Sequence, residues 1–128
     1  MTYYLAKPLS IGFNEAGARV MLALKDEGFG VLTDIDVAAT MKAKLGADFR
    51  RYRILGACNP KLAFEALSLE DKVGTMLPCN VVVQELDSGE VEVAAINPVA
   101  SMMAIENPAL KERAGQIRAK LERVIDAV

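Results

Sequence analysis

The sequence predicts a single α+β domain in which strands and helices follow one another in the order βαβαβαββα. The chain has 128 residues, which is the length of one ordinary domain. Segments with strand-like patterns alternate along it with segments in which apolar residues recur every three or four positions, as on one face of a helix. No linker, internal repeat or low-complexity stretch divides the sequence, so residues 1–128 are expected to form one domain.

The N-terminal segments predict a strand followed by a helix. The strand covers Met1–Lys7 and is expected to end at Pro8. The helix covers residues 15–27, with Asn14 as its N-cap and Gly28 as its stop. Its apolar stripe consists of Val20, Met21 and Leu24, with Gly17 below them.

Two further strands surround a short helix. The strand Phe29–Ile35 leads to Asp36, which is expected to cap a helix that stops at Gly46. The next strand, Tyr52–Cys58, contains an uninterrupted run of small and apolar residues that suggests burial on both faces of the sheet. One face of the short helix carries Val37, Met41 and Leu45.

Three of the five prolines follow an asparagine, and each Asn-Pro pair predicts the start of a helix. Asparagine is a preferred N-cap, and proline is preferred at the first helical position. Asn59 precedes the helix Pro60–Leu67, and a second pair lies at residues 97–98. The third pair, at residues 107–108, opens the most amphipathic helix of the chain. Its expected buried stripe is Leu110, Ala114, Ile117, Leu121, Val124 and Ile125.

The segments Val81–Leu86 and Glu90–Ile96 predict a β-hairpin. A two-residue turn would place Glu85 opposite Glu92, and like charges in that position are unfavourable. A three-residue loop with Gly89 in the left-handed conformation avoids that pairing. It places on one face Val81, Val83, Glu85, Val91, Val93 and Ala95, and on the other Gln84, Glu90 and Glu92.

The composition excludes several classes of function. The chain contains no histidine, which excludes Ser-His-Asp and Cys-His catalysis and imidazole metal sites. With 15 basic and 17 acidic residues the net charge is −2, so no nucleic-acid partner is expected. Two cysteines without histidine make a poor zinc site, and the single pair Gly28-x-Gly30 is no dinucleotide fingerprint. We therefore predict no metal and no cofactor.

The expected location is the cytoplasm. The longest apolar runs are far shorter than the roughly 20 residues of a membrane span, so no membrane contact is expected. The N-terminus lacks the pattern of a signal peptide. Cys58 and Cys79 are then expected to be reduced thiols.

Cys58 and Cys79 are the candidate reactive thiols. Cys58 directly precedes the N-cap Asn59, where free N–H groups and the helix dipole favour anions, including a thiolate. The alternative is a buried core cysteine that ends a strand. If the strands carrying Cys58 and Cys79 are antiparallel, both thiols lie at one end of the sheet; if they are parallel, the thiols lie at opposite ends. The sequence leaves both arrangements open.

Two other groups are weighed as sites. Together with Asn59, Arg51 and Arg53 are candidates for binding an anion or ligand, although a solvated strand entrance explains the arginines better. Met102 and Met103 are a candidate partner surface, because the apolar stretch Val99–Ile105 falls outside the regular pattern. The alternative for this stretch is a short helix packed on its own core. Asp34 and Asp36 fit a turn and an N-cap better than a Mg²⁺ site.

The sequence Cys-Asn-Pro-Lys-Leu-Ala-Phe-Glu-Ala-Leu at residues 58–67, followed by Leu-Pro-Cys at 77–79 and Val81, resembles the domain-of-unknown-function 302 family. The segment Gly-Phe-Gly-Val at residues 28–31 and the closing Asn-Pro helix also fit, so the resemblance covers nearly the whole chain. It implies helices packed against a curved, largely antiparallel sheet, and often a homodimer. It brings no catalytic residues. At residues 97–98 Asn-Pro stands where Asp-Pro is expected, which argues against an acidic role there.

Three hypotheses of function follow. The first is a non-enzymatic domain that binds a small ligand or a protein partner, since the catalytic constellations are missing. The second is a thiol-based redox or sulfur-carrier protein that uses Cys58 with Cys79. The third is a purely structural dimer. We expect a homodimer, with the segment Val99–Ile105 as its apolar surface.

Overall fold

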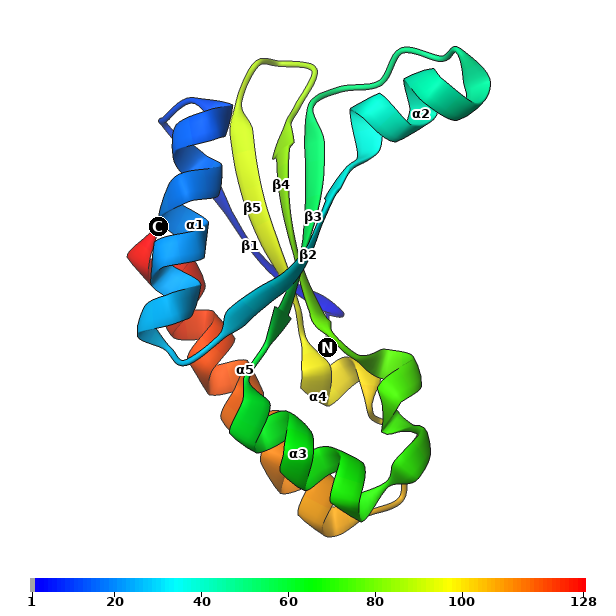
Figure 1. Ribbon diagram of the computed structural model, residues 1–128. Helices are drawn as coiled ribbons and strands as arrows, with labels where there is room; N and C mark the ends of the chain where they lie inside the picture. Colours follow the sequence, from blue (N-terminus) through cyan, green and yellow to red (C-terminus); the bar gives the residue numbers. More distant parts are fainter. Residues whose placement is uncertain (1) are drawn as a thin grey trace.

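The computed structural model describes residues 2–128 and contains one five-stranded sheet (Figure 1). All neighbouring strands are antiparallel, in the spatial order β1-β5-β4-β3-β2. The predicted α+β class and the largely antiparallel sheet are therefore confirmed. Met1, where the predicted first strand begins, lies outside the described residues. The strands are β1 (Tyr4–Leu9), β2 (Gly30–Asp36), β3 (Tyr52–Cys58), β4 (Cys79–Glu85) and β5 (Val91–Ile96).

The helices follow the predicted order βαβαβαββα with two additions, a 3₁₀-helix before β4 and a short helix at the second Asn-Pro pair. The 3₁₀-helix η1 (Asp71–Met76) lies between β3 and β4 and was not predicted. The α-helices are α1 (Phe13–Asp26), α2 (Val37–Leu45), α3 (Pro60–Leu69), α4 (Pro98–Ser101) and α5 (Pro108–Ala127). No helix within residues 2–128 combines the length and the apolar character that a membrane crossing requires.

All three Asn-Pro pairs start helices, as predicted. Each asparagine side chain accepts a hydrogen bond from an amide in the first turn, and each proline fills the first helical position. Asp36 caps α2 in the same way, and Gly46 ends that helix with φ of 65°. The donors are Leu62 for Asn59 (3.2 Å), Val99 for Asn97 (3.1 Å) and Leu110 for Asn107 (3.2 Å).

Several predicted boundaries differ from those in the structure, and two of these differences have a clear physical reason. Helix α1 begins at Phe13 with Gly12 as its N-cap, so Asn14 lies inside the first turn. Its side chain instead accepts a hydrogen bond from Arg51 at 2.9 Å. Strand β1 continues through Pro8 to Leu9. A proline is tolerated there because β1 is an edge strand, where one N–H need not join the ladder.

The β4–β5 hairpin has the predicted three-residue loop. Glu85 lies opposite Val91, and Gln84 lies opposite Glu92 and donates a hydrogen bond to it at 3.2 Å. Gly89 has φ of 86°, in the left-handed region that favours glycine. In this register Glu85 and Glu92 are not directly opposite each other. Avoiding that like-charge pair is the electrostatic reason why a three-residue loop is expected.

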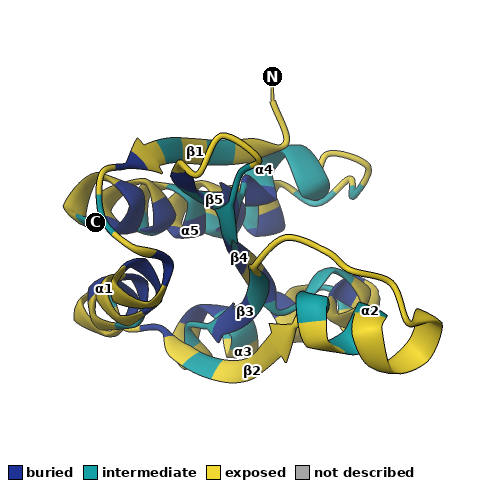
Figure 2. Cartoon of the chain, turned by 90° about the horizontal axis from the view of Figure 1, so that it is seen from above, coloured by how far each residue is buried: buried dark blue, intermediate teal, exposed yellow. Residues whose placement is uncertain are grey.

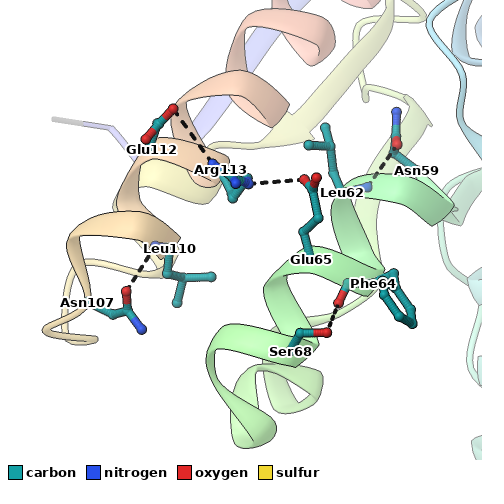
Figure 3. A network of polar contacts seen from close by, with 9 residues as sticks. All are labelled: Asn59, Leu62, Phe64, Glu65, Ser68, Asn107, Leu110, Glu112 and Arg113. Carbon is teal, nitrogen blue, oxygen red and sulfur yellow. Dashed lines mark hydrogen bonds and ion pairs between the residues drawn. The ribbon is translucent and has the colours of Figure 1, made fainter.

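The main core lies between one face of the sheet and helices α1 and α5, which stand on the same side of it (Figure 2). A second, smaller cluster fills the space between α3, η1, α4 and the start of α5. Beside this second cluster, an ion pair between Arg113 and Glu65 (3.0 Å) links α5 to α3 (Figure 3). All six residues of the predicted α5 stripe are buried, which confirms that prediction.

The other face of the sheet carries an apolar row that α1 and α5 do not cover. Side chains on one strand face pair across the ladder, so the row can be followed from edge to edge. Its members are half-buried or exposed, whereas the facing core positions of β4 and β5 are buried. Helix α2 follows the edge strand β2, and none of its nine residues is buried. The row consists of Ile35, Ile54, Val82, Ala94 and Ala6.

Candidate functional site

The two cysteines lie at the same end of the sheet, because β3 and β4 are antiparallel. Ala57 pairs directly with Cys79, and Cys58 is the next residue along β3. Directly opposed residues of an antiparallel pair have Cα atoms about 4.5–5.5 Å apart. Of the two arrangements that the sequence left open, the structure therefore has the one that places both thiols at the same end of the sheet. Both are free thiols.

A cavity of about 290 Å³ opens beside the two cysteines. The end of β3 and the start of α3 form one side, and the segment from η1 to β4 forms another. Within the part of the chain that the structure describes, no charged side chain lines the cavity, which is therefore apolar. The lining consists of Phe29, Leu32, Ala57, Cys58, Asn59, Ala63, Ala66, Leu67, Gly74, Leu77, Pro78, Cys79 and Ile117.

Asn59 is the polar exception in this lining, and its side chain is already engaged. Its Oδ1 accepts the N–H of Leu62, and its Nδ2 donates to the carbonyl of Glu27 at 3.5 Å (Figure 3 shows the cap). The asparagine therefore shapes the start of α3 rather than offering a free polar group to a ligand. Its predicted role as the N-cap of α3 is confirmed.

Cys79 is held in its neutral form. Its side chain belongs to the main core and the residue is 5% exposed. The pKa of its thiol is raised to about 11, mainly by burial and to a lesser extent by the neighbouring Cys58. Near neutral pH Cys79 is thus almost entirely protonated. Cys58 is half-buried, so it is the more accessible thiol of the two.

The start of α3 has little capacity left to stabilise a thiolate on Cys58. Pro60 has no N–H, the amide of Leu62 bonds to the Asn59 side chain, and the amide of Ala63 bonds to the Asn59 carbonyl at 2.9 Å. The helix dipole adds at most about 1 kcal/mol. Neither thiol therefore has the surroundings of a strongly activated nucleophile.

Arg51 and Arg53 are not part of this site. They stand near the opposite end of β3 from Cys58, so they do not join Asn59 in one anion site. Arg53 donates two hydrogen bonds to Asp34, at 3.2 and 2.6 Å, and the hydrogen bond raises the pKa of its guanidinium. Arg51 lies over the Phe13 ring, 4.6 Å from its centroid. A second cavity of about 420 Å³ lies among these residues and also contains Asp36, so it holds charges of both signs.

The two methionines have different surroundings. Met102 is 2% exposed and belongs to the second core cluster, so it cannot form a partner surface. Met103 is 61% exposed. At Met102 the alternative interpretation is therefore correct: the segment after β5 is a short helical turn packed on its own core. The reason is that α3 and α5 leave a gap there, which the flexible methionine side chain fills.

Sequence reasoning missed several residues of the cavity. Leu32 lies there because the β2–β3 ladder shifts register between Val31 and Thr33, which leaves Leu32 as the extra residue. Leu77 and Gly74 come from η1 and its exit, for which no periodic signal exists. Within residues 2–128, no three His, Cys, Asp or Glu groups gather in a way that could hold a metal ion.

Comparison with known proteins places the chain in one family. The family model described as "Domain of unknown function DUF302" matches residues 5–128. The crystal structure of an uncharacterized conserved DUF302 protein from Bacillus stearothermophilus has a TM-score of 0.92 and 34% sequence identity. The similarity covers 99% of this chain and 98% of that one. No curated protein sequence matches.

Proposed function

The chain belongs to the DUF302 family, and from the geometry at the cysteine end of its sheet we propose that it binds a small, largely apolar molecule without transforming it. The observation that carries this proposal is the cavity of about 290 Å³ with no charged lining residue. Small-molecule sites are concave, mostly apolar and roughly 300–1,000 Å³ in volume, so the cavity suits a ligand at the small end of that range.

The cavity is supported on several sides by fixed elements. Ala57 and Cys79 belong to paired central strands, and Ala66 and Ile117 are buried residues of α3 and α5. Leu32 and Leu67 are 66% and 44% exposed, so they form an apolar rim at its mouth. This rim offers apolar contacts to the part of a ligand that extends beyond the mouth of the cavity.

A titration with toluene, followed by nitrogen–proton correlation NMR, tests the proposal. Toluene is a small apolar probe, one methyl group larger than the benzene that an engineered dry apolar cavity binds. We expect saturable shifts confined to amides of the cavity lining, such as those of Cys58 and Cys79. The variant Ala63→Phe should abolish them, because Ala63 lines the cavity and a phenyl group would fill it.

Ala119→Phe is the matched control, because Ala119 is an exposed residue of α5 that is not part of the lining. It should leave the shifts unchanged. Absence of lining shifts in the wild-type protein, or equal shifts in Ala63→Phe, would overturn the proposal. Native mass spectrometry of the purified protein then addresses which molecule it carries from the cell.

We also propose that the protein forms a homodimer, through the uncovered face of its sheet. Five apolar side chains form one row across all five strands of that face, and α2, which follows the edge strand β2, has no buried residue. An isolated helix of nine residues is marginal in water, so packing against a partner would stabilise it. Because one chain carries both the open face and the unpacked helix, two copies related by a two-fold axis cover both.

Light scattering at high micromolar concentration tests this assembly. We expect the mass of two chains for the wild type and of one chain for Val82→Lys, which places a charge in the middle of the row. Leu22→Lys is the control, because Leu22 is 65% exposed on α1, on the side of the sheet that the core helices cover. A monomeric wild type would overturn the dimer, and a dimeric Val82→Lys would overturn the proposed surface.

A further inference from the structure

Among residues 2–128, the two thiols are the only soft donor atoms that line the cavity, and they come from neighbouring strands. Cys58 ends β3 and Cys79 begins β4, next to the Ala57–Cys79 pair. Both belong to the same cavity lining, so both are within reach of one occupant. The remaining lining residues are apolar apart from Asn59, whose side chain is engaged by Leu62 and Glu27.

This donor set limits what the thiols could hold. Four-coordinate zinc needs two further nitrogen, oxygen or sulfur ligands, and hard cations need several oxygens; the lining offers neither. An apolar cavity also disfavours any occupant that leaves a net charge behind. Soft centres prefer thiolates. The matching occupant is therefore soft, takes two thiolates, becomes neutral on binding and can carry an apolar substituent.

Disulfide exchange fits the surroundings less well. The buried Cys79 stays protonated near neutral pH, and the arginines that could favour a thiolate are near the other end of β3. A soft centre does not need a preformed thiolate, because it displaces the thiol protons as it binds. Because the Cys79 thiol stays protonated near neutral pH, its oxidation is limited. The same thiol can still bind a soft centre, which displaces its proton.

We propose that Cys58 and Cys79 together hold a soft, thiophilic centre of the kind found in a monosubstituted trivalent arsenical, with its organic group in the apolar cavity. The inference rests on the proposed ligand cavity. With phenylarsine oxide, two arsenic–sulfur bonds form and the arsenic–oxygen bond breaks. The oxygen leaves as water with the two thiol protons, arsenic remains trivalent, and no electrons are transferred.

Phenylarsine oxide added to the full-length reduced protein tests the inference by intact-mass spectrometry. We expect one phenylarsenic group per chain, retained in excess glutathione and released by a dithiol. A second attachment point strengthens retention by at least about 100-fold over a single thiol. Cys58→Ser and Cys79→Ala should therefore each lose the group to glutathione, with folding checked by circular dichroism. Because Cys58 is only half-buried, Cys58→Ser decides the question if the Cys79 variant does not fold.

Three results would overturn the thiol pair: no adduct, two independent adducts per chain, or a Cys58→Ser variant that retains the group as well as the wild type. The toluene titration, repeated on Cys58→Ser, separates this failure from failure of the cavity. Toluene binding without arsenical retention removes the thiol proposal alone. Absence of toluene binding in the wild type removes the cavity proposal, on which the placement of the organic group depends.

Discussion

Gly56 offers the sharpest test of the packing around the cysteine end of the sheet. A Cβ atom added to Gly56 would lie 2.8 Å from Cγ of Pro78 and closer still to Oγ1 of Thr33. The Pro78 ring cannot rotate away, and Thr33 is β-branched and held in the next strand. Gly56→Ala should therefore act as overpacking and cost about 1–3 kcal/mol of unfolding free energy. For a domain of this size, 1 kcal/mol corresponds to a fall in Tm of roughly 2–8 °C.

Urea unfolding followed by circular dichroism measures this cost. Gly30→Ala is the matched control in the neighbouring strand, because nothing lies within 4 Å of its added Cβ. It should leave the midpoint unchanged or raise it slightly, as a glycine-to-alanine change does where the backbone permits it. Adding Thr33→Ala to Gly56→Ala should recover part of the loss, since it removes the nearer obstacle. Equal midpoints for Gly56→Ala and Gly30→Ala would refute the reasoning.

Three further predictions concern the core, a helix cap and a thiol. Leu121→Ala, at a fully buried position of α5, should lower the free energy of unfolding in urea by about 2–5 kcal/mol. Leu22→Ala, at an exposed position of α1, should change that free energy by no more than about 0.5 kcal/mol. Similar losses in the two variants would contradict the assignment of the buried stripe of α5. Asn107→Ala should cost about 1 kcal/mol, because it removes the cap of α5, and an unchanged midpoint would show that the cap adds nothing. Folding raises the pKa of Cys79 from 9.0 to about 11. Between these two pH values the thiol ionises in the unfolded chain but keeps its proton in the folded one, so the free energy of unfolding falls as the pH rises. The loss is roughly 2–3 kcal/mol, so Cys79→Ala should show a shallower alkaline decline than the wild type, and parallel curves would contradict the assignment.

The elements that the sequence predicted correctly are those decided by residues close together in the chain. The Asn-Pro pairs place a side-chain acceptor and a pre-set φ next to each other, and all three start helices. The hairpin register follows from one local conflict, between Glu85 and Glu92, and from a glycine that can adopt positive φ. In each case no distant part of the molecule has to be known.

The elements that were predicted wrongly depend on distant partners. Asn14 is a good N-cap by residue type, but Phe13 before it is 7% exposed and packs into the core as the first residue of α1. The helix must therefore begin earlier, and Arg51, just before β3, donates a hydrogen bond to the side-chain oxygen of Asn14. Met102 is similar: its burial depends on the gap between α3 and α5, which its neighbours in the sequence do not reveal.

The candidate site could not be predicted from its motif because strand direction, not the motif, creates it. Residues 59–78 connect β3 to β4 through α3 and η1, and a connection of roughly a dozen residues or more could equally have crossed over to a parallel strand. In that case Cys58 and Cys79 would lie at opposite ends of the sheet and share no cavity. The observed reversal places the end of β3 beside the start of β4, where α3, η1 and α5 complete an apolar enclosure. The cysteines thus become a possible functional pair only through the antiparallel topology, and Cys-Asn-Pro by itself specifies no more than a helix start.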